Sequence, residues 1–286
     1  MEVSTVKYSP DVDAWEYLKI INRVLLAVTK SNSFGFGIHN LKQFGHQLRM
    51  FAARNSTVKN FYCFSGDINN CFPAIEHDFL TKCLNEMIPN NGPFIYAKYW
   101  VTLNNGKSFY KPTVGYKTLA DAKMNLEKTC KIVTDSSRDM KRITKTELLE
   151  TIQRYAMKNV FKFENKIYRC HRGVPQGSAL STLLCKIYLA QMEKKLFFNL
   201  SNIQNGYELF GDKALFLRYV DDYLLFSIDK TLAEDIIQKL VQDSKNYSMK
   251  LNEEKTVMTS NLSHLKNSQT SLSKCRFIEA AERINW

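Results

Sequence analysis

The hydrophobic residues of the first sixty positions recur every three or four residues, which is the spacing of a helix with one buried face. The segment 12–29 predicts such a helix, with its apolar face at Trp15, Leu18, Ile21, Val24, Leu25 and Val28. A Ser- and Gly-containing stretch over 31–37 interrupts the pattern, and a second helix is expected over 41–54. We therefore expect a helical lead-in over residues 1–60.

From residue 61 the pattern alternates between strand and helix. The apolar run 61–67 predicts a short buried strand, and a helix is expected from Pro73 to about residue 88. A second long helix is expected after Gly177 and Ser178, either of which can cap it, because the apolar residues that follow also fall on one face.

The last third of the chain predicts a β-hairpin and one more helix. Residues 214–228 are two apolar runs separated by two adjacent aspartates, which predicts a hairpin with acids at its bend. Thr231 and Glu234 are spaced as a capping box for the helix, a further strand is expected over 249–258, and 261–274 is expected to be loose. This order of elements is typical of an α+β fold, an antiparallel sheet with helices on one face.

Residues 106–166 differ from the rest of the chain in composition. They contain 14 Lys or Arg and 7 Asp or Glu, a net charge of +7, and their apolar runs are short. We interpret this segment as an insertion or connecting subdomain, with helices expected near 119–133 and 145–160.

Composition narrows the class of protein. An apolar fraction of 44% over 286 residues is typical of a globular core, no stretch is apolar enough to span a membrane, and acids near the start argue against a secretory signal. Seven scattered cysteines without a CxxC pair argue against a disulfide framework or zinc knuckle and favour a reducing compartment. The net charge of +12 favours a polyanionic partner such as nucleic acid, although composition alone equally allows a role in solubility.

The adjacent carboxylates of Asp221 and Asp222 are the strongest candidate for chemistry. They are flanked by strand-forming residues, where their burial would be costly unless cations neutralised them. In polymerases two Mg²⁺ ions, about 3.5–4 Å apart, stabilise the attacking 3′-oxygen and the leaving phosphate oxygens. Asp67, at the end of the predicted buried strand, is the candidate for a third ligand. The alternative is an ordinary solvated turn, in which aspartate is common.

Two further segments contain candidate phosphate-binding residues. The loop 172–178 has two glycines and leads into a helix, so its backbone can approach a phosphate closely. Lys255 could donate a proton to a departing pyrophosphate or pair with its charge. The alternatives are a loop that only caps a helix and a solvated lysine on an edge strand.

Four segments, taken in order, resemble the motifs of reverse transcriptases: SGDINNCF (65–72) resembles motif A, GVPQGS (173–178) motif B, YVDD (219–222) motif C and LNEEKT (251–256) motif D. The similarity is greatest to telomerase reverse transcriptases, whose forms of motifs B and C are very similar to GVPQGSALSTLLC and LRYVDDYLL. The basic segment 106–166 falls where that family has an insertion in the fingers.

The resemblance implies a right-hand polymerase palm with part of the fingers. The resulting division is a helical lead-in with partial fingers (1–60), palm with motif A (61–98), a basic fingers insertion (99–168), palm with motifs B to D (169–260) and a loose C-terminal segment (261–286). We find no counterpart of the family's upstream domains, of motifs 1 and 2, or of the primer grip and thumb. Ser65 and Gly66 also depart from the apolar or basic residues that usually precede the motif A aspartate.

The resemblance also implies roles for individual residues. Asp67, Asp221 and Asp222 would bind two Mg²⁺ ions and, with Lys255, form the catalytic set. The remaining candidates would contact the nucleotide or the nucleic acid: Phe72 beneath the sugar, where it would exclude a 2′-hydroxyl, Gln176 and Gly177 in the nucleotide and template pocket, and Arg218 at a nucleic-acid backbone.

The implied function is that of an RNA-directed DNA polymerase, the catalytic subunit of telomerase, which adds telomeric repeats to chromosome 3′ ends. Its partners would be a template RNA, a telomeric single-stranded DNA 3′ end and deoxynucleoside triphosphates, at telomeres in the nucleus and without a membrane. Two alternatives stay open. One is a mobile-element or retron-like reverse transcriptase, and the other is a non-catalytic palm fragment that binds an RNA–DNA hybrid.

Overall fold

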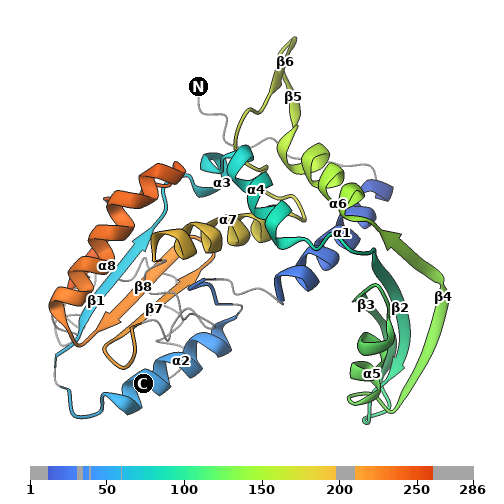
Figure 1. Cartoon of the computed structure of the whole chain (residues 1–286), viewed down its shortest axis with the longest axis horizontal. Helices are drawn as coiled ribbons and strands as arrows, with labels where there is room; N and C mark the ends of the chain where they lie inside the picture. The colour runs from blue at the N-terminus through green and yellow to red at the C-terminus, as the bar shows by residue number, and fades with distance from the viewer. Residues whose placement is uncertain (1–11, 31–34, 39, 59, 198–209, 260–286) are drawn as a thin grey trace. The chain divides into compact units, whose positions relative to one another are not determined.

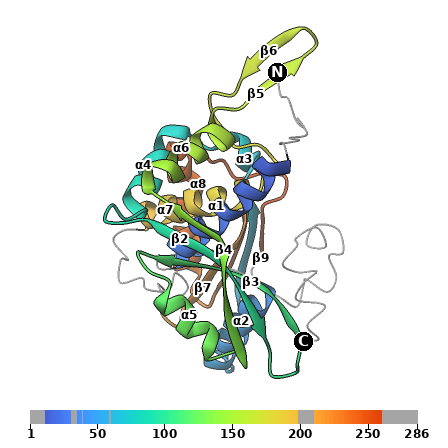
Figure 2. The same cartoon turned by 90° about the vertical axis from the view of Figure 1, so that its right-hand side faces the viewer.

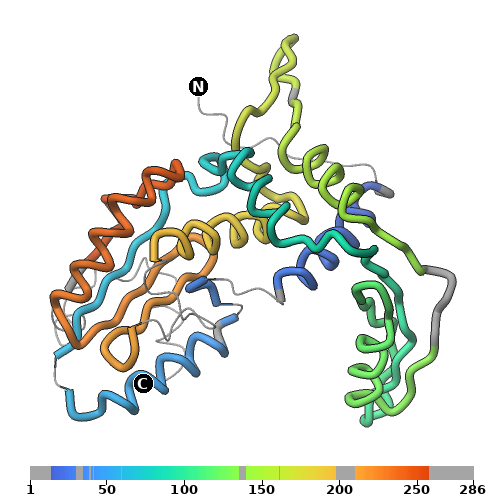
Figure 3. The backbone as a smooth tube through the Cα atoms, viewed as in Figure 1, coloured from blue at the N-terminus to red at the C-terminus, as the bar shows by residue number. Residues whose placement is uncertain are grey.

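The computed structural model describes residues 12–30, 35–38, 40–58, 60–197 and 210–259 (Figure 1). The chain divides into two compact units, each assembled from two separate segments: 1–32 with 77–184, and 33–76 with 185–286. The backbone therefore passes from one unit to the other three times (Figure 3). The expected loose segment 261–286 lies outside the described residues.

The unit that contains 33–76 and 185–286 is built on a four-stranded sheet in the order β7-β8-β1-β9. Its strands are β1 (Tyr62–Asp67), β7 (Ala214–Tyr219), β8 (Asp222–Ser227) and β9 (Val257–Thr259), and all pair antiparallel. Its helices are α2 (Leu41–Arg54), the short α3 (Cys71–Ala74), the C-terminal part of α7 (Ser181–Leu196) and α8 (Lys230–Asp243). The predicted antiparallel sheet and α+β class are confirmed.

Helices cover both faces of this sheet, whereas the sequence predicts helices on one face. Leu217 and Arg218 follow each other on β7, so their side chains point to opposite faces. Leu217 packs in a core cluster with Phe44 and Leu48 of α2. Arg218 instead contacts Glu193 of α7. The helices α2 and α7 therefore lie on opposite faces.

The other unit contains an antiparallel three-stranded sheet in the order β3-β2-β4. The strands are β2 (Phe94–Thr102), β3 (Ser108–Tyr116) and β4 (Ile132–Ile143), and α5 (Ala120–Glu127) lies against them. A small core of Ala97, Tyr99, Val101, Leu126 and Cys130 holds α5 to the sheet. The sequence analysis does not predict this sheet, whereas the helix expected near 119–133 is present as the shorter α5.

The described residues of the same unit form three further helices and a hairpin. The helices are α1 (Val12–Lys30), α4 (His77–Met87) and α6 (Lys145–Ile152), and α6 continues into a π-helical turn, Gln153–Met157. The hairpin of β5 (Val160–Phe163) and β6 (Lys166–Arg169) extends away from α6 (Figure 2). None of the helices in the described part of the chain is both long and apolar enough to cross a membrane.

Several local predictions need correction. The helix expected from Pro73 to residue 88 is interrupted at Ile75, which has extended backbone (φ −59°, ψ 121°) and a fully buried side chain. Asp229 caps α8 by accepting a hydrogen bond from the Leu232 amide at 3.1 Å, so Thr231 lies inside the helix rather than at its start. The expected strand 249–258 is reduced to β9 and one isolated bridge. The helices predicted over 12–29 and 41–54 are confirmed.

Candidate functional site

The three candidate acids meet at one end of the β7-β8-β1 sheet. Asp67 is the last residue of β1, Asp222 is the first residue of β8, and the two are cross-strand partners. Tyr219 pairs with Asp222 across the hairpin, which leaves Val220 and Asp221 as its two-residue turn. Directly opposed side chains on antiparallel strands have Cβ atoms about 4.5–5.5 Å apart. The register therefore places the Asp67 and Asp222 side chains side by side, with Asp221 next to them.

The turn that contains Asp221 has an unusual backbone. Val220 has a φ of +59°, and Asp221 does not have a positive φ. A positive φ at the first turn position alone is the pattern of a type II′ turn, in which that position is normally glycine. For a β-branched valine this conformation is strained. Val220, immediately before Asp221, therefore has a backbone conformation that valine normally avoids.

Lys255 contacts the same group of acids. Its Nζ donates a hydrogen bond to Asp67 Oδ2 at 2.7 Å. This hydrogen bond raises the pKa of Lys255, and the charge of Asp67 and, more weakly, the charges of Asp222 and Asp221 act in the same direction. The Lys255 side chain is 61% exposed and that of Asp67 16%, so water screens part of the attraction. Lys255 is nevertheless positively charged and within reach of the acids.

Backbone contacts bring the segment before Lys255 to the end of β1. The Asn252 amide donates to the Asp67 carbonyl at 2.7 Å, and the Asn69 amide donates to the Lys250 carbonyl at 2.8 Å. A Cβ atom at Gly66 would lie 2.7 Å from the Phe64 ring and 3.2 Å from Leu251 Cδ2. Gly66, which departs from the usual motif, therefore permits the close approach of this segment to β1.

The chemistry of the donor set fits Mg²⁺. All three candidates are carboxylates, and Mg²⁺ prefers oxygen ligands. The Lys255 ammonium, itself a cation, already forms an ion pair with the Asp67 carboxylate. Among the described residues, no three acidic, histidine or cysteine side chains form a preassembled metal cluster. Mg²⁺ is commonly held by one or two carboxylates together with water and substrate phosphates, so a complete protein cage is not required.

Phe72 belongs to the same unit as the acids. After β1 the chain turns at Asn70, which has a left-handed backbone (φ +50°), into α3. Phe72 lies on α3 and is half-buried. Its suggested position beneath a sugar stays a prediction.

Gln176 and Gly177 belong to the other unit, in the loop before α7. Gln176 is exposed, and Gly177 has a φ of +87° with open space where a Cβ would be. The Ser181 hydroxyl donates to the Pro175 carbonyl, and α7 begins at Ser181, shortly after the candidate caps Gly177 and Ser178. The structure therefore groups the acids, Phe72 and Lys255 in one unit, and this loop in the other.

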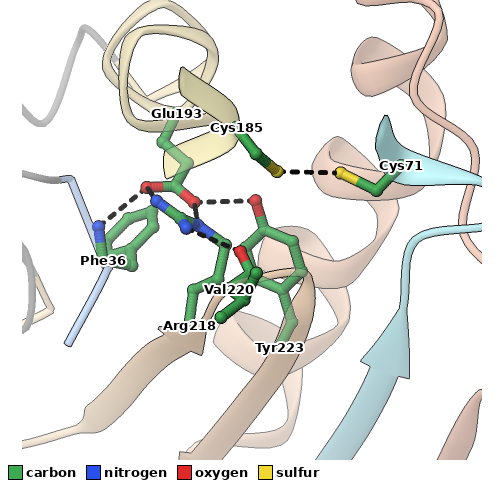
Figure 4. Close-up of polar contacts among 7 residues, drawn as sticks. All are labelled: Phe36, Cys71, Cys185, Glu193, Arg218, Val220 and Tyr223. Atoms are coloured by element: carbon green, nitrogen blue, oxygen red, sulfur yellow. Dashed lines mark hydrogen bonds and ion pairs between the residues drawn. The ribbon is translucent and has the colours of Figure 1, made fainter. Parts of the chain in front are cut away.

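Arg218 does not lie where it can contact nucleic acid, and that prediction is wrong. Its side chain is 0% exposed and forms an ion pair with Glu193, which is also buried (Figure 4). Burial alone lowers the pKa of Arg218, but its interactions with neighbouring groups, above all Glu193, raise the pKa overall. No motif in the sequence indicates a role for Glu193. On α7 it is spaced four residues from Leu189 and three from Leu196, both buried, so the helical pattern places this acid on the buried face, where it requires a partner.

Comparison with known proteins identifies related sequences. A family model described as reverse transcriptase (RNA-dependent DNA polymerase) matches residues 123–278, more than half of the chain. The telomerase reverse transcriptase of Rattus norvegicus is 27% identical over 215 residues, 69% of this chain, and that of Oryzias latipes is 24% identical over 222 residues, 72% of this chain. The chain spans only 18% and 19% of the length of these two relatives.

Solved structures show the same fold. A telomerase from Candida albicans in complex with a fragment of telomeric RNA aligns with a TM-score of 0.59 at 19% identity, covering 85% of this chain and 34% of that one. An apo telomerase from Candida tropicalis aligns with a TM-score of 0.57 at 18% identity, covering 87% of this chain and 36% of that one.

Proposed function

The chain belongs to the reverse transcriptase (RNA-dependent DNA polymerase) family, and from that premise we propose that it is the palm of a telomerase reverse transcriptase. It would extend chromosome 3′ ends with telomeric repeats by copying an RNA template. The observation that carries this proposal is the cross-strand pairing of Asp67 with Asp222, next to Asp221 in the hairpin turn. The similarity to telomerase sequences from Rattus norvegicus and Oryzias latipes supports the choice among reverse transcriptases.

Asp67, Asp221 and Asp222 would hold two Mg²⁺ ions through their carboxylate oxygens. When bound, such ions promote attack by the primer 3′-oxygen and stabilise the leaving phosphate oxygens. The sheet register supports this assignment because it fixes the relative positions of Asp67 and Asp222 before any substrate arrives.

Lys255 would act on the triphosphate. Its pKa is raised by the hydrogen bond to Asp67, so its ammonium is protonated at neutral pH. A protonated lysine can donate a proton to the departing pyrophosphate or pair with its charge. The long, exposed side chain would allow the ammonium to leave Asp67 when phosphates enter.

The other assignments concern substrate selection and partners. Phe72 would exclude a 2′-hydroxyl, while Gln176 and Gly177 would line the nucleotide and template pocket. The partners would be a template RNA, a telomeric single-stranded DNA 3′ end and deoxynucleoside triphosphates, at telomeres in the nucleus. The net charge of +12 suits polyanionic partners of this kind.

Primer extension tests this function. The purified chain is incubated with a DNA primer annealed to RNA, deoxynucleoside triphosphates and Mg²⁺. We expect nucleotide incorporation that Asp221→Asn reduces by about a hundredfold or more, because loss of one electrostatic group at a reacting centre typically costs that much. Asp235→Asn, an exposed acid on α8, is the matched control and should leave incorporation unchanged.

The alternatives predict different results. Salt-dependent binding to an RNA–DNA hybrid without incorporation would identify a non-catalytic palm fragment. Among active outcomes, a single defined RNA that copurifies with the chain favours telomerase, and the element's own transcript favours a mobile-element enzyme. Full incorporation by Asp221→Asn would overturn the assignment of the catalytic acids.

A further inference from the structure

A fully buried ion pair lies beside the hairpin turn. Arg218 of β7 is 0% exposed and Glu193 of α7 is 1% exposed. The Glu193 carboxylate also accepts hydrogen bonds from the Phe36 amide at 2.8 Å and the Tyr223 hydroxyl at 2.7 Å (Figure 4). Burying two charges is costly, and a buried pair often stabilises a fold no more than apolar residues of the same size. Stability alone therefore does not account for this pair.

The third nitrogen of the Arg218 guanidinium points to the turn. Arg218 Nε and Nη2 donate to the Glu193 carboxylate, while Nη1 donates to the Val220 carbonyl at 2.8 Å (Figure 4). Val220 is the strained residue with a φ of +59°, directly before Asp221. A charged donor makes a stronger hydrogen bond than a neutral one. The guanidinium therefore holds the turn at its strained residue.

We propose that Arg218, oriented by Glu193, is a positioning residue that holds the Val220–Asp221 turn and thereby fixes the carboxylates of Asp221 and Asp222. The effect on metal binding rests on the proposed function, whereas the effect on the turn does not. The role requires arginine, because one planar group must serve Glu193 and the Val220 carbonyl at once. A lysine has a single nitrogen on a flexible stem and cannot reproduce this geometry.

The backbone of the segment 35–38 contacts both Arg218 and Glu193. The Arg218 amide donates to the Phe36 carbonyl at 2.8 Å, and the Ile38 amide donates to the Arg218 carbonyl at 2.9 Å. A Cβ atom at Gly35 would lie 2.1 Å from Glu193 Oε2, so only glycine leaves room for the carboxylate. The backbone of this segment therefore fixes both members of the pair.

Amide hydrogen exchange tests the effect on the turn without any metal. In Arg218→Lys we expect exchange in a peptide covering 217–225 to become about tenfold faster, since a charged hydrogen bond to the turn is lost. Arg54→Lys is the matched control, because Arg54 forms an exposed ion pair with Asp212 at 3.2 Å. The control should retain wild-type exchange. Wild-type exchange in a folded Arg218→Lys would overturn the proposal.

Manganese binding in a double-mutant cycle tests the effect on the carboxylates. Arg218→Lys should weaken Mn²⁺ affinity about tenfold, measured by electron paramagnetic resonance. In a Val220→Gly background the same change should cost far less, because glycine accepts a positive φ and needs no restraint. A purely structural role for Arg218 predicts the same loss in both backgrounds, and that result would overturn the proposal.

Further measurements distinguish a failure of the positioning role from loss of folding and from failure of the proposed function. Circular dichroism checks that each variant is folded. If Arg218→Lys does not fold, Tyr223→Phe removes one donor to Glu193 and keeps the ion pair. Tyr223→Phe should make amide exchange in the turn about threefold faster and weaken Mn²⁺ binding about threefold. If both stay at the wild-type value, the proposal is overturned. If wild-type protein binds no Mn²⁺ but the exchange difference persists, the proposed function fails and the positioning role stands.

Discussion

Asp67 and Asp222 stand directly opposite each other where β1 and β8 meet the hairpin turn. Like charges in this relationship destabilise a sheet, typically by a few tenths of a kcal/mol to about 1 kcal/mol. The Lys255 ammonium offsets part of the repulsion from outside the sheet, at 2.7 Å from Asp67. The palm therefore holds two mutually repelling carboxylates at a place where a bound divalent cation would neutralise them.

Neutralising one member of this pair should stabilise the metal-free protein. We expect Asp222→Asn to raise the melting temperature by a few degrees in EDTA, because it removes the cross-strand repulsion. We also expect Mg²⁺ to raise the melting temperature of the wild type and to have no such effect on Asp222→Asn. Thermal melts with and without Mg²⁺ measure both effects, with Asp235→Asn as the control. A lower melting temperature in EDTA would contradict the repulsion argument.

The ion pair of Lys255 should give a stability difference that depends on pH. The folded-state pKa of Lys255 is raised, so its contribution is fully present below the unfolded-state value of about 10.4 and is lost as pH rises through the folded-state pKa. We expect Lys255→Gln to lower stability by less than about 1 kcal/mol at pH 8, since the pair is largely exposed. Urea unfolding at pH 8 and pH 11 measures the difference between the two proteins, which should be smaller at pH 11. A stability difference between the two proteins that grows with pH would contradict the stabilising ion pair of Lys255 with Asp67.

The sequence predicts the palm well because its strands are apolar and short. The run 61–67 ends at Asp67, and the two apolar runs of 214–228 are separated by Asp221 and Asp222, so the sequence pattern shows both the strands and their candidate functional residues. The sequence pattern does not predict the β3-β2-β4 sheet in the same way. Strand β3 is exposed or half-exposed throughout and contains Lys111 and Pro112, so it has no apolar period.

The roles of Glu193 and Arg218 depend on tertiary structure. The two residues are 25 positions apart, on a helix and a strand, and their pairing follows from how α7 packs on β7. The resemblance to known motifs suggests an exposed arginine before the aspartates. It cannot reveal that α7 buries this arginine against an acid.

The buried cysteines should resist alkylation in the folded protein. Cys71 Sγ lies 3.3 Å from Cys185 Sγ, and this hydrogen bond, followed by burial, raises the pKa of Cys71 well above the ordinary value. Burial raises the pKa of Cys63 to about 12. Since only the thiolate reacts, iodoacetamide at pH 8 should label the half-exposed Cys170 before Cys63 and Cys71, which should stay unlabelled until urea unfolds the chain. Mass spectrometry of the labelled peptides gives the order, and rapid labelling of Cys71 in the native state would contradict it.

Replacing Phe72 should change sugar selection more than overall rate. If the ring lies beneath the sugar, it collides with a 2′-hydroxyl and leaves a deoxyribose undisturbed. Phe72→Ala should then raise the ratio of ribonucleotide to deoxynucleotide kcat/KM by about tenfold or more, as expected when a steric clash worth about 1–3 kcal/mol is removed. Phe72→Tyr keeps the bulk of the ring and is the matched control, with a ratio close to that of the wild type. Single-nucleotide incorporation with each triphosphate gives both constants. A fall in kcat/KM for both sugars with an unchanged ratio would mean that Phe72, half-buried on α3, supports the fold rather than the choice of substrate.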